Sequence, residues 1–402
     1  MPVEGATQAP LNRKKYEITL SIGLYIHFPF CLSKCLYCSF NSVPYNPDSA
    51  RRYTEAIKKE IVIKAREYRL EGRSLKTIYF GGGTPSILPP SVIRDIIDVC
   101  GRIFCLEDGI EITIEANPDT LDMEKLDGLI RIGANRISLG FQSFSDRYLN
   151  LLGRSHDADK ARRIFKACRS TGFKNIGLDL IYAIPDQQIN EWLLTVEEAI
   201  SLSPEHISTY CLSIDEGTLL YDRLNKGQIS PLSEDDQIEM YLAAGRILKK
   251  AGYFHYEISN FCLPGRSSRH NLLYWDRAEY LAIGAGAHSY IGNRRLCNPD
   301  SIERYIAGID SGHTDNMEEL LTMEDQFIDA VIFGLRKTEG IDLDDIRSRF
   351  DFDPLLIFRA EIDRLITEDM ITLSSSKIRL TRKGILLADQ VALEFLPIGN
   401  NQ

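Results

Sequence analysis

The sequence predicts an α/β protein: an open, three-quarter (β/α)6 barrel, then a mixed extension and a small helical domain. Two observations lead to this prediction. Strand-like and helix-like segments alternate from residue 22 to about 214, and such alternation builds a parallel sheet covered by helices. The alternation stops two units short of the eight that close a barrel, so we expect an open sheet. The composition, 44% hydrophobic and 26% charged over 402 residues, allows a large core.

The elements of the barrel are predicted from hydrophobic periodicity, with apolar runs as strands and amphipathic stretches as helices. The strand candidates are 22–28, 75–80, 110–116, 135–139, 175–181 and 206–212. The helix candidates are 48–69, 90–104, 122–132, 157–171 and 189–201. Proline and Ser/Asp-rich segments supply the helix starts, and glycines supply the stops.

The second half of the chain follows a different pattern. Residues 215–315 are irregular, with a helix near 234–251 and a strand-like segment at 253–258. Beyond about 316 come helices near 323–336, 342–350 and 354–367, a hairpin over 371–380 and a last helix near 382–395. That order resembles a winged-helix module. We therefore predict a flexible lead (1–20), the barrel (21–214), an extension (215–315) and a winged-helix-like domain (316–402).

Charge and composition disfavour several classes of function. The net charge is −10 with no basic run, whereas nucleic-acid binding normally leaves a basic stripe. Residues 317–395 hold 10 basic and 17 acidic residues, so the winged-helix-like domain is expected to pack or to dock a partner, not to read DNA. No window approaches 18 uninterrupted apolar residues, so no membrane-spanning segment is expected.

The leader and the cysteines indicate a reducing compartment. Residues 1–20 lack the apolar region of a signal peptide and the Arg-rich pattern of a transit peptide. Nine cysteines, an odd number without secretory features, favour a cytoplasmic protein. Six of them are expected to be packed thiols: Cys100, Cys105, Cys168, Cys211, Cys262 and Cys297.

The other three cysteines, Cys31, Cys35 and Cys38, follow the first strand with C-x3-C-x2-C spacing. Three thiolates can hold three irons of a [4Fe–4S] cluster and leave the fourth iron open. The same spacing also lies on one face of a helix, which would make these residues packed thiols. A zinc site is a further alternative, although structural zinc usually has a fourth Cys or His ligand. Pro29 favours a loop, and the spacing favours the cluster without excluding the alternatives.

Several polar groups stand where predicted strands end, the edge of a parallel barrel at which ligands bind. The run Gly81-Gly82-Gly83-Thr84 lets backbone approach a ligand, or is a plain tight turn. Asp179 lies in an otherwise apolar strand, where a carboxylate is costly unless it is paired or binds hydroxyls. Glu115, Gln142 and Arg154 complete the set, although Glu115 could be solvated and Arg154 a surface charge. Together they suit a zwitterionic amino acid, a sulfonium and a ribose diol, the groups of S-adenosylmethionine.

With these residues in view, the sequence resembles the radical S-adenosylmethionine (SAM) superfamily, and more closely its oxygen-independent coproporphyrinogen III oxidase-like family. The shared marks are Tyr-Ile-His-Phe-Pro-Phe-Cys, Gly-Gly-Gly-Thr-Pro-Ser, Glu-Ala-Asn-Pro, Gly-Phe-Gln-Ser-Phe and Gly-Leu-Asp-Leu-Ile-Tyr. The resemblance implies an open barrel of the radical SAM type with a [4Fe–4S] cluster on Cys31, Cys35 and Cys38. It also implies S-adenosylmethionine on the open iron, reductive cleavage of its C–S bond to a 5′-deoxyadenosyl radical, and a reductant for the cluster. The implied S-adenosylmethionine contacts are Tyr25, Gly82, Gly83, Thr84, Glu115, Gln142, Arg154 and Asp179.

The family has an oxidase branch and a haem chaperone (HemW-type) branch. The oxidases carry a further cysteine two residues after the third, where this chain has Phe40. They also have a longer N-terminal extension, whereas only 30 residues precede Cys31. Both features resemble the chaperone branch.

The segment His270-Asn271-Leu-Leu-Tyr274-Trp275 matches the H-N-x-x-Y-W pattern of the chaperone branch. A neutral imidazole can ligate haem iron, and the aromatic pair offers flat apolar surface. The alternative is a core histidine with aromatic neighbours, and His288 is a weaker candidate for the same role.

We therefore expect a haem chaperone that carries haem as cargo, hands it to haem-requiring acceptor proteins and keeps a radical SAM site. The alternatives are a coproporphyrinogen III oxidase of porphyrin biosynthesis and an unrelated radical enzyme acting on another tetrapyrrole.

Overall fold

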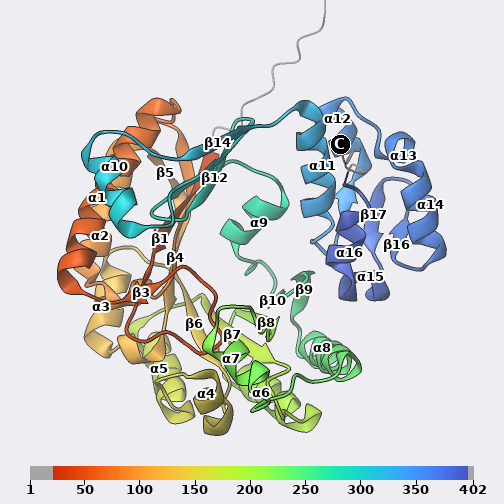
Figure 1. Cartoon of the computed structure of the whole chain (residues 1–402), viewed down its shortest axis with the longest axis horizontal. Coiled ribbons are helices and arrows are strands. Elements are labelled where there is room, and N and C mark those ends of the chain that lie inside the picture. Colours follow the sequence, from red (N-terminus) through yellow and green to blue (C-terminus); the bar gives the residue numbers. More distant parts are fainter. Residues whose placement is uncertain (1–20, 397–402) are drawn as a thin grey trace, which may run out of the picture.

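Twelve strands form one continuous sheet in the computed structural model, which describes residues 21–396. The predicted flexible lead, residues 1–20, lies outside this range, as do residues 397–402. The central strands pair in parallel and in chain order: β1 (Ser21–Phe28), β4 (Ser74–Gly82), β5 (Cys105–Ala116), β6 (Arg136–Gln142), β7 (Ile176–Tyr182) and β8 (His206–Cys211). They are the six predicted strands, and the sheet curves into an open arc (Figure 1).

Helices cover the outer face of this arc (Figure 1). They are α1 (Pro47–Glu67), α2 (Pro90–Ile103), α3 (Met123–Arg131), α5 (Ala158–Thr171) and α6 (Ile189–Ser201), each close to a predicted helix. Their buried apolar sides share one core with the sheet. A further short helix, α4 (Asp146–Leu152), was not predicted, because seven residues are too few to show a clear helical period.

The predicted extension lengthens both edges of the sheet. At one edge β10 (Asn260–Cys262) pairs antiparallel with β8 and with β9 (Phe254–Glu257). At the other, β11 (Tyr280–Ile283) pairs parallel with β1, followed by β12 (His288–Ile291), β13 (Arg294–Cys297) and β14 (Met317–Leu320). The helices of this region are α7 (Leu219–Asn225), α8 (Glu234–Lys250), α9 (Arg269–Trp275) and α10 (Ile302–Asp310). Strands before and after residue 214 therefore belong to one sheet and share one core.

A buried ion pair joins the extension to the barrel. Lys64 Nζ lies 2.9 Å from Glu60 Oε1 on α1, and both side chains are fully buried. The Glu60 carboxylate also accepts hydrogen bonds from Gly284 N (2.8 Å), Asn298 Nδ2 (2.7 Å) and the Tyr305 hydroxyl (2.5 Å). Because a buried charge is stable only when it is paired and hydrogen-bonded, this network ties α1 to the extension.

The C-terminal domain has its own core, centred on Phe327, Val331, Ile378 and Phe395. Its elements are α11 (Met323–Gly334), β15 (Ile341–Asp342), α12 (Leu343–Phe350), α13 (Pro354–Ile357), α14 (Arg359–Thr367), β16 (Ile371–Leu373), β17 (Lys377–Leu380), α15 (Arg382–Leu386) and α16 (Ala388–Leu393). The predicted hairpin is β16–β17, and β15 adds a third strand. The predicted helices 354–367 and 382–395 are each two helices, because the backbone leaves helical geometry at Phe358 and Leu387.

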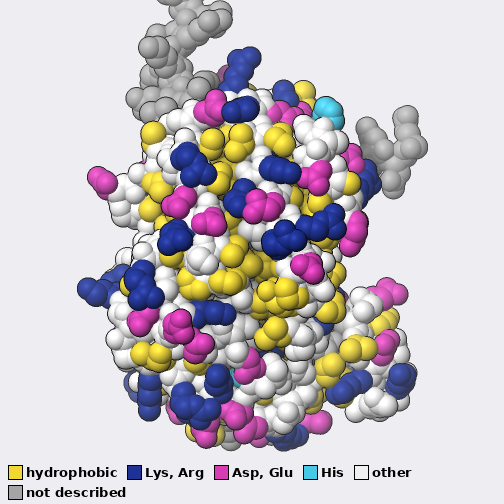
Figure 2. Space-filling model, turned by 90° about the vertical axis from the view of Figure 1, so that its left-hand side faces the viewer, with side chains coloured by type: hydrophobic (Ala, Val, Ile, Leu, Met, Phe, Trp, Pro, Cys, Tyr) yellow, Lys and Arg dark blue, Asp and Glu magenta, His cyan; other side chains and the backbone are white. Residues whose placement is uncertain are grey.

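Basic, acidic and apolar side chains are interspersed on the outer face shown in Figure 2. No single charge gathers there into a stripe. Within residues 21–396, no helix is both long enough and apolar enough to cross a bilayer.

Candidate cofactor site

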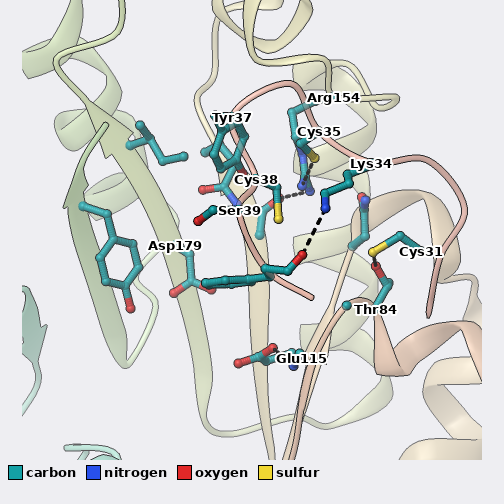
Figure 3. A pocket seen from close by; sticks show the side chains of 18 of the residues that line it. Cys31, Lys34, Cys35, Tyr37, Cys38, Ser39, Thr84, Glu115, Arg154 and Asp179 are labelled. Atoms are coloured by element: carbon teal, nitrogen blue, oxygen red, sulfur yellow. Dashed lines mark hydrogen bonds between the residues drawn. The ribbon is translucent and has the colours of Figure 1, made fainter. Parts of the chain in front are cut away.

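A cavity of about 370 Å³ lies at the carboxyl ends of the parallel strands. All three cysteines of the C-x3-C-x2-C loop line it, and Figure 3 shows them on one side of the space, with Glu115 and Asp179 on others. The predicted polar residues that line it are Gly82, Gly83, Thr84, Glu115, Gln142, Arg154 and Asp179. The structure thus assembles groups that lie far apart in the sequence.

Tyr25 is the predicted contact residue that does not line this cavity. Its hydroxyl lies 3.1 Å from His27 Nδ1, and its ring stacks on Tyr79 with centroids 6.0 Å apart. As an inward-facing residue in the middle of β1, Tyr25 sits below the strand end, within the barrel.

Cys31 ends the short strand β2 (Phe30–Cys31), and Cys35 and Cys38 lie in the loop that leads from it to β3 (Val43–Pro44). Backbone bonds from Val43 N to Pro29 O and from Tyr45 N to Cys31 O, both 2.8 Å, close the base of this loop. The non-helical geometry excludes the alternative of three thiols on one helix face.

Two of the loop sulfurs accept hydrogen bonds. The Thr84 hydroxyl donates to Cys31 Sγ (3.6 Å), and Arg154 Nη1 donates to Cys35 Sγ (3.3 Å). Burial raises the pKa of Cys38. Among residues 21–396, no group of three or more His, Cys, Asp or Glu side chains is arranged to hold a metal ion. In a [4Fe–4S] cluster each thiolate binds a different iron, and donors to sulfur tune the iron, so three thiols that line one cavity, two of them with donors to sulfur, fit such a cluster.

The glycine run lets the end of β4 pack against the cysteine loop. A Cβ on Gly82, whose φ is +108°, would lie 2.5 Å from the His27 ring. A Cβ on Gly83 would lie 2.7 Å from the carbonyl oxygen of Phe30, the residue before Cys31. Close packing of backbone on backbone therefore explains these glycines, alongside the predicted approach to a ligand.

Two half-buried carboxylates, Glu115 and Asp179, line the cavity. Glu115 accepts hydrogen bonds from the Tyr79 hydroxyl (2.7 Å) and from Gly82 N (3.1 Å). Burial raises the pKa of Glu115 to about 7, while the Tyr79 hydrogen bond opposes the shift and the nearby Asp179 charge adds to it. Asp179 accepts from Ser138 Oγ (3.1 Å), and burial raises its pKa as well. Both groups would gain from a bound cation or from hydroxyl donors.

Gln142 and Arg154 also line the cavity, Gln142 from a left-handed backbone conformation and Arg154 with its guanidinium held by hydrogen bonds. Gln142 has φ +67°, at an irregularity in the pairing of β6 with β7. Arg154 Nη2 donates to Gly140 O (2.7 Å), so this guanidinium ties the cysteine loop to β6. Its Nε is buried without a hydrogen-bond partner in the described structure.

The H-N-x-x-Y-W segment forms α9, which lies between the sheet and the C-terminal domain (Figure 1). His270 is 1% exposed, and its Nδ1 and Nε2 are hydrogen-bonded to the Thr77 (2.8 Å) and Tyr274 (2.9 Å) hydroxyls. Burial lowers the pKa of His270 to about 3, so its ring is neutral. In this conformation His270 has the surroundings of the packed histidine that the sequence left as the alternative.

The other predicted haem residues, Asn271, Tyr274 and Trp275, lie on the same helix as His270. The Ser268 hydroxyl donates to Asn271 Oδ1 (3.1 Å), and Trp275 packs under the guanidinium of Arg336 (4.9 Å). His288 is exposed on β12 with Nε2 3.4 Å from Cys297 Sγ. The structure does not bring any of these residues to the cofactor cavity.

Sequence reasoning missed two charged residues inside the barrel. Glu111 accepts from the backbone N–H groups of Arg269 (3.2 Å) and His270 (3.1 Å), and Arg136 is 2% exposed. The sequence pattern that indicates them is the alternation of side chains along a strand: Glu111 lies four residues before Glu115 and so faces the same side of the sheet. Arg136 on β6 pairs with Thr113 of β5 and faces that side too.

The cysteines outside the loop differ in part from the expectation of packed thiols. Cys100, Cys168 and Cys262 are buried and Cys297 is half-buried, but Cys105 and Cys211 are exposed. Cys105 begins β5 and Cys211 ends β8, and a residue at a strand end can be exposed to solvent even when its neighbours in the sequence are apolar. Phe40, in place of a further cysteine, is 64% exposed at the cavity.

Known proteins share this fold and sequence. Residues 25–199 match the radical SAM superfamily, and residues 321–387 match the HemN C-terminal domain. The solved structure of coproporphyrinogen III oxidase (HemN) from Escherichia coli, titled a radical SAM enzyme, superposes with a TM-score of 0.80. It is 23% identical, with 93% of this chain and 89% of that chain covered, and shows the shared fold.

Sequence relatives are more similar. Heme chaperone HemW of Bacillus subtilis is 34% identical over 374 residues, which cover 92% of this chain and 98% of that protein. Heme chaperone HemW of Lactococcus lactis is 34% identical over 92% of this chain and 96% of that protein. The chain therefore belongs to the radical SAM superfamily and, within it, to the family of proteins named heme chaperone HemW.

Proposed function

We propose that this protein binds haem and transfers it to haem-requiring proteins, and that it holds a [4Fe–4S] cluster and S-adenosylmethionine in the cavity. One observation carries the proposal: the identity of 34% to heme chaperone HemW of Bacillus subtilis extends over 98% of that protein. The odd number of cysteines and the reducing environment that a cluster requires support a cytoplasmic site of action.

The cluster site is proposed to be the cysteine loop. Cys31, Cys35 and Cys38 would supply the thiolates, with Thr84 and Arg154 donating to two of the sulfurs. When bound, a reduced cluster supplies one electron to the sulfonium of S-adenosylmethionine. The loop and the glycine-packed end of β4 hold the donors in place and shape the cavity around them.

The S-adenosylmethionine site is proposed to be the opposite wall. Glu115, in its ionised form, offers a negative charge to the cationic ligand, and Asp179 offers acceptors to ribose hydroxyls. Gln142 and the guanidinium of Arg154, which line the cavity, would be donors for the ligand carboxylate. Tyr25, which does not line the cavity, would support the site indirectly by packing on Tyr79 and by its hydrogen bond with His27.

The haem site is proposed to be α9, with His270 as the iron ligand and Asn271, Tyr274 and Trp275 around it. A neutral imidazole is the form that ligates iron, and His270 is neutral. Both of its nitrogens are occupied in the present conformation, so ligation requires α9 to move.

The experiment is anaerobic cluster reconstitution followed by two assays on one sample. Ferric haem is added and the Soret band is recorded; coproporphyrinogen III is then offered with S-adenosylmethionine and a one-electron reductant. We expect a stable Soret complex, transfer of haem to an apo-haem protein, and no protoporphyrinogen IX.

The variant His270→Ala should weaken the Soret complex, whereas His288→Ala serves as the matched control and should not. Turnover of coproporphyrinogen III would make the protein an oxidase and overturn the proposal. So would the absence of any Soret band from reconstituted protein that binds S-adenosylmethionine.

A further inference from the structure

The helix α9 is held at its N-terminus by the barrel. The carboxylate of Glu111, on β5, accepts the N–H groups of Arg269 and His270. Arg269 Nη1 also donates to Gly109 O (2.8 Å). These contacts join the first turn of α9 to the interior of the barrel, because Glu111 is buried and faces inward.

The opposite end of α9 is held by the C-terminal domain. Asp276 Oδ1, just after α9, lies 2.5 Å from Lys337 Nζ. Arg277 Nε lies 3.4 Å from Asp329 Oδ2 on α11. Together with the guanidinium of Arg336 over Trp275, these contacts bind α9 to the C-terminal domain, which has a core of its own.

Between these anchors α9 fills the inner side of the barrel. The His270 ring stacks on Tyr79 with centroids 5.0 Å apart and on Tyr25 at 6.2 Å. Leu273 packs there too, 2.2 Å from where a Cβ on Gly23 would stand. Iron ligation needs a nitrogen lone pair aimed at the metal, so the closed position and a His270–iron bond exclude each other.

We propose that α9 is a gate to the haem site: it must withdraw from the barrel before His270 meets iron, and Glu111, Lys337 and Asp329 hold it closed. This inference rests on the proposed haem function. Withdrawal frees His270 and uncovers the faces of Tyr25 and Tyr79, flat aromatic surface suited to a macrocycle. A partner that pulls the C-terminal domain away from Asp276 and Arg277 would thereby open or empty the site.

The gate can move because α9 is weakly stable by itself. A helix of seven residues is too short to persist in water, so its position depends on its anchors. The Asp276 side chain is 50% exposed and that of Lys337 is 15% exposed, and a partly exposed ion pair contributes little to stability. Trp275 Nε1 is buried without a partner in the described structure, which costs free energy in the closed state and favours opening.

The test compares Asp276→Ala with a matched control, Asp310→Ala. Asp310 is 53% exposed and accepts from Lys59 Nζ at 2.7 Å, so each substitution removes one ion pair from a half-exposed aspartate, and only one of the pairs is on the gate. The lysines differ, because Lys337 is 15% exposed and Lys59 is 54% exposed. The full-length protein is measured by stopped-flow Soret absorbance with ferric haem. Hydrogen exchange of residues 269–276 is followed by mass spectrometry without haem.

We expect Asp276→Ala to bind haem about 2- to 5-fold faster, the effect of losing one exposed ion pair. Exchange of residues 269–276 should accelerate by the same factor, and Asp310→Ala should match the wild type in both measurements. Glu111→Gln, which loses a charged acceptor of two N–H groups, should accelerate both by about tenfold or more.

If neither Asp276→Ala nor Glu111→Gln changes the rate of haem binding, while His270→Ala still abolishes the complex, the gate is refuted. The proposed haem function is then unaffected. Faster exchange without faster haem binding also overturns it, because opening would then not lie on the binding path. A wild type that never forms a Soret complex refutes the proposed function and the gate with it.

Discussion

Replacing Glu115 by Gln should remove most of the pH dependence of the proposed binding of S-adenosylmethionine. Both Glu115 oxygens are taken by donors, from Tyr79 and Gly82, and burial raises its pKa to about 7. The sulfonium of the ligand favours the ionised carboxylate. Glutamine keeps the shape and one acceptor but cannot ionise.

The magnitude follows from the pKa. With a value of about 7, Glu115 is ionised in about one molecule in ten at pH 6 and about nine in ten at pH 8. If binding requires the ionised form, the Kd for S-adenosylmethionine falls about tenfold between these pH values. In Glu115→Gln the difference should nearly vanish, apart from the titration of the ligand, which both proteins share.

The same group contributes to the pH dependence of stability. Its pKa rises from 4.5 to about 7 on folding, so the native state favours the protonated carboxyl. That stabilisation is complete below pH 4.5 and is lost as pH rises to 7. The shift corresponds to about 3 kcal/mol, which water in the cavity reduces to about 2 kcal/mol. Glu115→Gln should therefore be more stable than the wild type at pH 8 by about that amount.

The assay is equilibrium dialysis of S-adenosylmethionine at pH 6, 7 and 8 with anaerobic, reconstituted, oxidised protein, paired with urea unfolding. Glu257→Gln is the control: burial raises the pKa of Glu257 to about 6, and it does not line the cavity. It should leave the pH dependence of ligand binding unchanged. The reasoning would be refuted if the wild-type Kd for S-adenosylmethionine were equal at pH 6 and pH 8. It would also be refuted if the Kd of Glu115→Gln changed with pH as much as that of the wild type.

Three further outcomes are expected. Gly83→Ala should lower the unfolding free energy by about 1–3 kcal/mol in urea titrations, because its Cβ meets a backbone carbonyl. Gly101→Ala, inside α2, should stabilise by about 0.5–1 kcal/mol, because its Cβ would make only an ordinary contact, 3.7 Å from Leu106 Cδ1; equal effects would contradict the packing. Lys64→Met should cost about 3–5 kcal/mol by leaving the buried Glu60 charge unpaired, and adding Glu60→Gln should restore much of it. Arg154→Lys should lower the cluster's reduction potential in an EPR-monitored titration, since a donor to a loop sulfur is lost; an unchanged potential would contradict this role.

The barrel was predictable because its signals are local. Each of the six parallel strands is an apolar or alternating segment flanked by an amphipathic helix. The polar residues at the strand ends had to face the same edge once the strands were parallel. That rule gathers Glu115 and Gln142 around the cysteine loop, whereas Asp179 reaches the cavity from within β7. The broken helices of the C-terminal domain escaped prediction, because a single non-helical residue such as Phe358 or Leu387 leaves the hydrophobic period intact.

The amino-acid sequence by itself determined the cysteine spacing, the order of the strands and the polar groups at their ends, since local composition and periodicity decide these features. Only the tertiary structure decided how distant segments meet. It added strands from residues 254–320 to opposite edges of the sheet, moved Tyr25 out of the cavity wall and enclosed His270 between the barrel and the C-terminal domain. The partners of His270 come from β4 and its own helix, and those of α9 from β5 and α11. Such long-range contacts set whether a histidine is a packed residue or an accessible ligand, and no local pattern encodes them.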